Sequence, residues 1–204
     1  GGDGGDGNDV IYAGDQTYAA HSIGAGAGDD YIYAGHGGDD VRGGNGNNTV
    51  YLGSGSDKYT GGDDIDIVDG GSKDFIFTDS VDNSFKYNLS ADLSGDINEI
   101  HLGAGNDEYR GGIGKDIVHG GADDDKIWGN DGENELYGDA GNDHLYGGKD
   151  NDTINGGTGK DVMSPGTGIN TIDCGQDNDL DIVAINNNAA GIDTIKNANP
   201  HDYI

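Results

Sequence analysis

The chain has 204 residues, of which 42 are glycine and only 32% are hydrophobic, and its formal net charge is −29. So few apolar residues with so much charge are typical of disordered chains, and a folded form therefore needs a counter-charge. The 39 acidic residues exclude nucleic acid and anionic membrane surfaces as natural partners, and they favour divalent cations.

Residues 1–24 contain one complete nine-residue unit and a second, degenerate one. The complete unit places Asp9 at its sixth position and Ile11 at its eighth. The spacing then slips, and residues 16–24 form a degenerate unit with Ile23 at the eighth position. We interpret this stretch as an N-terminal repeat fragment with a register slip. Because it opens in mid-repeat, we expect the chain to be part of a longer protein.

Residues 25–78 hold six consecutive nonapeptides, of which the first reads AGAGDDYIY. The sixth position is Asp or Asn in five of them and Phe75 in the last. We predict a first block of repeats over this range. A phenyl ring offers no ligand oxygen, so we expect this block to stop binding metal near Phe75.

Residues 79–101 contain a single glycine and do not keep the repeat pattern over most of their length: DSVDNSFKYNLSADLSGDINEIH. We interpret them as a spacer or insertion between two blocks of repeats, and a dedicated binding loop is the alternative. The last nine residues of the stretch also fit a degenerate unit, with Asn98 at the sixth position and Ile100 at the eighth.

Residues 102–183 form the predicted second block, which contains eight nonapeptides such as GGIGKDIVH and GDAGNDHLY. The pattern fails after Cys174 and is one residue out of step at Ile182. Residues 184–204 alternate like short strands without the repeat pattern. The terminal strands of a solenoid are open edges, so we predict that this last segment is a cap.

The two halves of each unit predict the fold. Positions one to five are rich in glycine, which suits a tight turn, and positions seven to nine suit a short strand with one inward side chain. One inward residue per unit gives a core only when units stack. Two units per coil give an all-β, right-handed parallel β-roll, a flattened β-solenoid. The eighth position is apolar in all fifteen units: Ile11, Ile32, Val41, Val50, Tyr59, Val68, Phe77, Tyr109, Val118, Ile127, Leu136, Leu145, Ile154, Met163 and Ile172.

The sixth position predicts calcium sites. Calcium takes six to eight oxygen ligands and accepts carbonyls of glycine-rich turns beside carboxylates. We predict these metal ligands: Asp9, Asp30, Asp39, Asn48, Asp57, Asp66, Asp107, Asp116, Asp125, Asn134, Asp143, Asp152, Asp161, Asn170 and Asp179. About a dozen calcium ions would bring roughly 24 positive charges, so folding should be coupled to binding. Edges that carry only Asp should bind calcium more tightly than edges that alternate Asp with Asn.

These nonapeptides resemble the calcium-binding repeats of the RTX, or hemolysin-type, family of bacterial proteins over roughly residues 1–183. The resemblance implies export through type I secretion machinery and calcium-driven folding outside the cell. The implied location is extracellular or at the bacterial cell surface, and the implied role is support of a larger toxin, adhesin or enzyme. Departures from the repeat, such as Asn48 and Asp123, put individual sites in doubt and leave the roll intact.

Two other classes of function stay open at this point. A carbohydrate- or cell-surface-binding module is the main alternative, because tyrosine recurs at the ninth position, as in Tyr33 and Tyr146. A secreted hydrolase or epimerase whose catalytic domain lies elsewhere is the other. The chain itself carries no recognisable catalytic constellation, so we expect it not to be an enzyme. No apolar run reaches the length of a membrane span, and we therefore expect no transmembrane segment.

Overall fold

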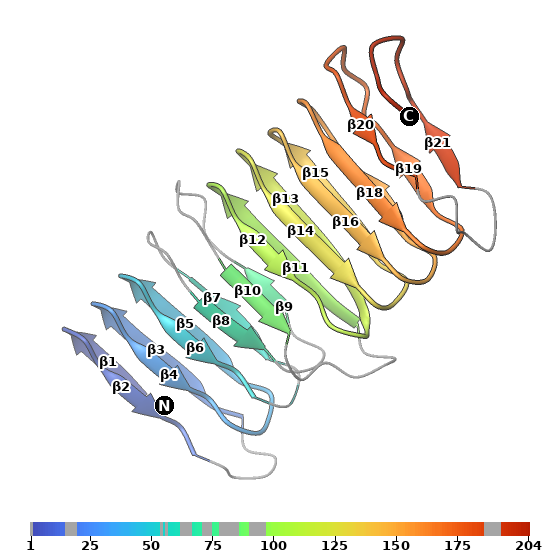
Figure 1. The fold of residues 1–204 in the computed structure, drawn as a ribbon. Helices are drawn as coiled ribbons and strands as arrows, with labels where there is room; N and C mark the ends of the chain where they lie inside the picture. Colours follow the sequence, from blue (N-terminus) through green and yellow to red (C-terminus); the bar gives the residue numbers. More distant parts are fainter. Residues whose placement is uncertain are drawn as a thin grey trace.

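The computed structural model describes residues 2–14, 20–53, 55, 57–61, 67–70, 75–77, 86–89, 97–185 and 193–204; for residues 2–3, 69–70, 75–77 and 86–89 it describes the backbone alone. These residues form strands joined by turns, and the protein is an all-β parallel solenoid (Figure 1). Within the described ranges, no helix is long and apolar enough to cross a membrane.

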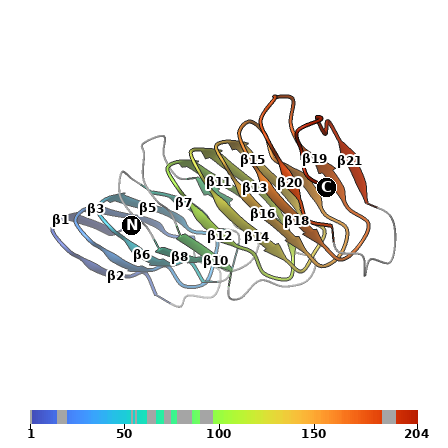
Figure 2. The ribbon, with the colours of Figure 1, turned by 45° about the horizontal axis from the view of Figure 1, so that its top comes forward.

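The strands alternate between two parallel sheets. The first sheet has eleven strands: β1 (Gly2–Asp6), β3 (Ser22–Ala27), β5 (Asp40–Asn45), β7 (Lys58–Thr60), β9 (Phe75–Phe77), β11 (Ile97–Ala104), β13 (Lys115–Ala122), β15 (Glu135–Ala140), β17 (Thr153–Asn155), β19 (Thr171–Asp173) and β21 (Thr194–Lys196). The second has ten: β2 (Val10–Tyr12), β4 (Tyr31–Tyr33), β6 (Thr49–Tyr51), β8 (Ile67–Gly70), β10 (Lys86–Leu89), β12 (Glu108–Arg110), β14 (Lys126–Asn130), β16 (His144–Gly148), β18 (Val162–Gly166) and β20 (Ile182–Val183). Figure 2 shows the flattened shape that results.

The core is built mainly of the apolar side chains at the eighth positions, as predicted, and first-position residues such as Leu52 and Leu102 add to it. Leu136 lies opposite Val118 and Ile154 in the register of the first sheet, and all three are fully buried. Partners along one sheet are 18 residues apart because each coil contains two units. The degenerate units take part as predicted, since Ile23 and Ile100 are also buried in this core.

The sheets run through the stretch that was predicted to be a spacer. Strand β10 pairs with β8 and β12, and β11 pairs with β9 and β13. The spacer prediction is therefore wrong for residues 86–89, whereas residues 97–101 form a strand with Ile100 buried, in agreement with the degenerate unit that the sequence also offered. The two blocks form one continuous roll. Register also corrects the last unit of the first block, because Ile76 and not Phe77 lies opposite Tyr59 and Ile100. A turn can absorb a one-residue change in length, whereas a strand must keep its partners in register.

The C-terminal segment adds one strand to the first sheet and a single bridge to the second. Strand β21 pairs with β19, and Tyr203 forms a bridge with Ile182. Val183 is 3% exposed and occupies the inward position, while Ile182 is 41% exposed. The turn before β20 therefore contains two residues more than a regular unit, and it brings Asp181 to the place that the period assigns to Asp179.

Candidate metal-binding turns

Polar side chains at the sixth position form two files, one along each edge of the roll. The first file precedes the strands of the first sheet and contains His21, Asp39, Asp57, Asn98, Asp116, Asn134, Asp152, Asn170 and Asp193. The second file precedes the strands of the second sheet and contains Asp9, Asp30, Asn48, Asp107, Asp125, Asp143, Asp161, Asp181 and Asp202. Most of these side chains are no more than 2% exposed.

One oxygen of each carboxylate holds neighbouring coils together. The backbone N–H of Asp107 donates to Oδ1 of Asp125 at 2.8 Å, and the N–H of Asp125 donates to Oδ1 of Asp143 at 2.8 Å. The same bond joins Asp143 to Asp161 at 2.9 Å. This repeating bond explains why the sixth position requires an oxygen acceptor, and why the acceptor residues recur along each edge.

The second carboxylate oxygen is buried and has no hydrogen-bond donor. This holds for Oδ2 of Asp9, Asp30, Asp39, Asp125, Asp143, Asp152, Asp161, Asp181 and Asp193. A buried acceptor that lacks a donor costs about 1–3 kcal/mol, and more when it is charged. Such groups are rare in native proteins, and their recurrence along both files points to cations bound beside these aspartates.

The first residue of each turn makes room for this oxygen. A Cβ added to Gly120 would lie 2.5 Å from Oδ2 of Asp125 and 2.7 Å from the carbonyl oxygen of Gly138. The equivalent Cβ at Gly138 or Gly156 would meet the carboxylate of Asp143 or Asp161. Glycine at this position therefore leaves the space in which a carboxylate and a carbonyl approach the same ion.

The asparagine side chains show which groups surround the place that Oδ2 takes in an aspartate. Oδ1 of Asn134 accepts the N–H of Asp116 at 2.9 Å, so the amide nitrogen must point the other way, and it donates to the carbonyl of Gly132 at 3.1 Å. Asn48 likewise donates to the carbonyl of Gly46 at 2.9 Å. The amide nitrogen of Asn170, by contrast, is buried without a partner. At Asn48 and Asn134 a donor of the side chain itself satisfies turn carbonyls of the kind that a cation would bind.

Burial raises the pKa of the aspartates in these files. The pKa of Asp125 rises to about 8, and those of Asp143 and Asp152 rise to about 7. The pKa of Asp161 and of Asp181 rises to about 6. Desolvation is the largest cause, neighbouring carboxylates add to it, and the donated backbone N–H opposes both. Without a metal ion, these groups therefore compete for protons near neutral pH.

Lowering the pH should stabilise the metal-free roll. The folded aspartates bind protons more tightly than an unfolded Asp, whose pKa is about 3.9. Linkage then requires the stability to be greatest below about pH 4 and to fall as pH rises through the folded values near 6 to 8. Far-UV circular dichroism of the metal-free protein between pH 4 and 8 measures this. A β-signal that does not change with pH would contradict it.

Substituting Gly120 with alanine should abolish metal binding at the turn of Asp125. The added methyl group occupies the space between Oδ2 of Asp125 and the carbonyl of Gly138, so carboxylate and carbonyl cannot share an ion. At calcium about 100-fold above its Kd, losing one ion costs about 2.7 kcal/mol. Chemical denaturation in calcium measures the loss, and Lys126→Ala, at an exposed neighbour, should leave stability unchanged.

Two of the predicted ligands are not placed in the files. Asp66 lies outside the described residues. Asp179 is exposed, and Asp181 takes its place in the second file because the turn is two residues longer. Asp193 and Asp202, the last members of the two files, were not predicted, although "DTI" from residue 193 keeps the Asp-x-apolar spacing.

His21 also lies in the first file. Its Nδ1 lies 2.9 Å from Oδ1 of Asp39, and its backbone N–H donates to the same oxygen. The sequence places it at the sixth position of the degenerate unit 16–24. His21 therefore keeps the backbone bond to the next coil, and its imidazole lies against the carboxylate of Asp39.

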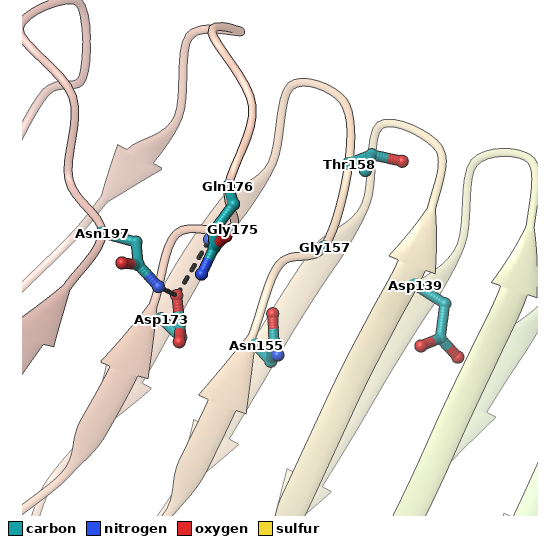
Figure 3. A pocket seen from close by; sticks show the side chains of 8 residues that line it. All are labelled: Asp139, Asn155, Gly157, Thr158, Asp173, Gly175, Gln176 and Asn197. Carbon is teal, nitrogen blue, oxygen red and sulfur yellow. Dashed lines mark hydrogen bonds between the residues drawn. The ribbon is translucent and has the colours of Figure 1, made fainter.

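The outward faces carry aromatic side chains and one polar pocket. Tyr12, Tyr31, Tyr33 and Tyr51 form ring contacts on the second sheet, with centroids 5.5–6.4 Å apart. A pocket of about 270 Å³ lies over the first sheet and its turns (Figure 3). Its lining residues are Asp139, Asn155, Gly157, Thr158, Asp173, Gly175, Gln176 and Asn197, and none of them belongs to either file.

Comparison with known proteins bears directly on the files. A family model described as the RTX calcium-binding nonapeptide repeat, four copies long, matches residues 3–17, 25–50, 36–68, 94–118, 101–136, 110–145 and 137–172. These matches cover well over half of the chain. A search of curated proteins gives no match.

Proposed function

Because the chain belongs to the family of RTX calcium-binding nonapeptide repeats, we propose that the buried aspartates of both files bind calcium and that binding folds the roll. The family identifies the chain as a calcium-binding β-roll. Assignment of the ions to individual turns rests on one observation, the unpartnered buried Oδ2 atoms. Each turn then supplies one carboxylate oxygen and several carbonyl oxygens, the hard ligands that calcium prefers.

We propose further that Asn48 and Asn134 mark turns that need no ion. Their amide nitrogens donate to the carbonyls of Gly46 and Gly132, so these turns are satisfied without metal. This replaces the expectation that such turns are weaker calcium sites. About a dozen ions remains the proposed number, since the aspartates far outnumber the asparagines in the two files.

If folding is coupled to calcium binding, the calcium concentration of each compartment determines where the roll folds. A chain with a net charge of −29 stays expanded where calcium is scarce and folds where it is abundant. We propose that it is exported unfolded, through type I secretion machinery, and folds outside the cell as part of a larger toxin, adhesin or enzyme. The repeats themselves are proposed to be structural and without catalytic activity.

The calcium midpoint of folding tests this location. Trp128 is the only tryptophan in the chain and lies on β14, so its fluorescence reports folding of the central coils. Extracellular calcium modules have Kd values of about 10⁻⁴ to 10⁻³ M, and we expect a midpoint in this range, with no response to magnesium. A midpoint at or below about 10⁻⁶ M would contradict the proposal, because the chain would then fold before export.

Glycan binding is a second candidate, favoured by the tyrosine cluster of the second sheet. Tyr12 is 69% exposed, and Tyr31 and Tyr33 are 37% and 36% exposed, so their rings are accessible for stacking. Glycan-array binding of the calcium-folded protein, compared with Tyr12→Ala, tests this candidate. Absence of binding, or equal binding by the variant, would refute it.

A further inference from the structure

The turn between β19 and β20 has a cysteine at its first position, where six of the eight nonapeptides from residue 102 to 173 have glycine. Cys174 is 1% exposed. In the preceding coil on the same edge, a Cβ at Gly156 would meet the carboxylate of Asp161. A side chain at the first position therefore points at the carboxylate of its own turn, which here is Asp181.

The thiol and two carboxylates meet at this point. Sγ of Cys174 and one carboxylate oxygen from each of Asp181 and Asp202 all lie within 4.8 Å of one another. Among the residues that the structure describes, no other group of three or more His, Cys, Asp or Glu side chains is so close. Asp181 is fully buried, and its Oδ2 has no hydrogen-bond partner.

The surrounding backbone holds this group in place. The N–H of Asp181 donates to Oδ1 of Asp202 at 3.0 Å, and the N–H of Asn199 donates to Oδ2 of Asp202 at 2.6 Å. The N–H of Cys174 donates to the carbonyl of Lys196 at 3.1 Å. Three consecutive segments of the C-terminal coils thus supply one donor set.

We propose that Cys174, Asp181 and Asp202 bind a thiophilic divalent cation of the Zn²⁺ class. Calcium takes oxygen ligands, whereas a thiolate selects zinc and other soft or borderline metals. Zinc binds sulfur at about 2.3 Å and carboxylate oxygen at about 2.0–2.2 Å, distances that bring three such donors together around one ion. Three protein ligands leave the fourth tetrahedral position to water.

A bound metal ion also compensates the negative charge that Asp181 and Asp202 place beside the Cys174 thiol. Burial, with the charges of Asp181 and Asp202, raises the pKa of the Cys174 thiol to about 12, so the sulfur carries its proton in the metal-free protein. A bound cation replaces this proton and neutralises the carboxylates, as metal binding to thiols requires. The inference therefore goes beyond calcium binding and assigns a different metal to one turn.

Cobalt provides the test, because thiolate-bound Co²⁺ has a charge-transfer band that oxygen-bound Co²⁺ lacks. The protein is first folded in calcium under reducing conditions and then titrated with Co²⁺. We expect one equivalent to produce the band, Zn²⁺ to abolish it, and millimolar calcium to leave it unchanged. Absence of the band in the calcium-folded protein would overturn the proposal.

Matched variants separate this site from folding as a whole. Cys174→Gly restores the residue of the regular repeat, so it should fold in calcium and lose the band, and Cys174→Ser should do the same. Asp181→Asn should weaken Zn²⁺ binding at least about tenfold. Asp179→Asn, at an exposed position of the same turn, should retain the band. A band that persists in Cys174→Ser would refute the site, whereas failure of the parent to fold in calcium would refute the proposed function instead.

Discussion

Removal of calcium by a chelator at neutral pH is expected to convert the roll into an expanded chain with little regular structure. The files stack buried carboxylates along both edges, and metal-free aspartates such as Asp125 and Asp143 face neighbouring carboxylates in a desolvated turn. The chain has few apolar residues to oppose this repulsion, since each strand contributes only one or two side chains to the core. Far-UV circular dichroism and the hydrodynamic radius measure the change.

The expected size of this effect follows from mass action. Each ion that binds only the folded form adds about 2.7 kcal/mol when calcium is 100-fold above its Kd. About four such ions would supply roughly 11 kcal/mol, which equals the whole stability of an ordinary domain. Magnesium is the control, because it keeps its water and demands strict octahedral geometry. A β-sheet spectrum that persists in chelator would show that the roll is folded without metal.

Replacing Leu136 with alanine should strongly destabilise the core. Leu136 is fully buried between Val118 and Ile154 in the middle of the first sheet. Removing a buried leucine side chain costs about 2–5 kcal/mol, because it leaves a cavity as well as losing apolar contact. A solenoid coil is stabilised only by its neighbours, so the cavity also weakens their coupling.

The position of the coil provides the control for this prediction. Ile11 has the same place in its unit but is only partly buried, since it lies in the first coil of the described chain. Ile11→Ala should therefore cost clearly less than Leu136→Ala in chemical denaturation at saturating calcium. Equal losses of unfolding free energy for the two variants would mean that a coil near the end and a coil in the centre contribute equally to stability. That result would contradict the nearest-neighbour account.

The sequence predicts most of this fold because two positions of the unit have fixed tasks. The eighth residue must be apolar to fill the core, and the sixth must accept the N–H of the preceding coil, as Asp125 does from Asp107. The degenerate unit that contains Asn98 and Ile100 keeps a polar sixth residue and a buried apolar eighth residue. A period of nine, with two units per coil, then fixes the partner of each strand at 18 residues wherever the units are regular.

The errors of the sequence analysis fall where the chain length of a turn changes. Strand pairing places Ile76 opposite Tyr59, and Asp181 accepts the N–H of Asp161. Counting in nines assigns these places to Phe77 and Asp179, because the turns between the strands differ in length from those of regular units. Turns tolerate such changes because their residues have no partner to match. The direction of the Asn134 amide could not be predicted either, because it depends on which atom of the side chain accepts the N–H of Asp116.

The central claim is tested most directly by counting the calcium ions bound to two variants, in one of which an aspartate becomes asparagine and in the other an asparagine becomes aspartate. Asp143→Asn supplies an amide nitrogen in place of the free Oδ2, and Asn134→Asp does the reverse at a turn whose carbonyl of Gly132 already has a donor. Equilibrium dialysis of the folded proteins should show one ion fewer for the first variant and one ion more for the second. Unchanged numbers in both would contradict the assignment of calcium to the buried aspartate files.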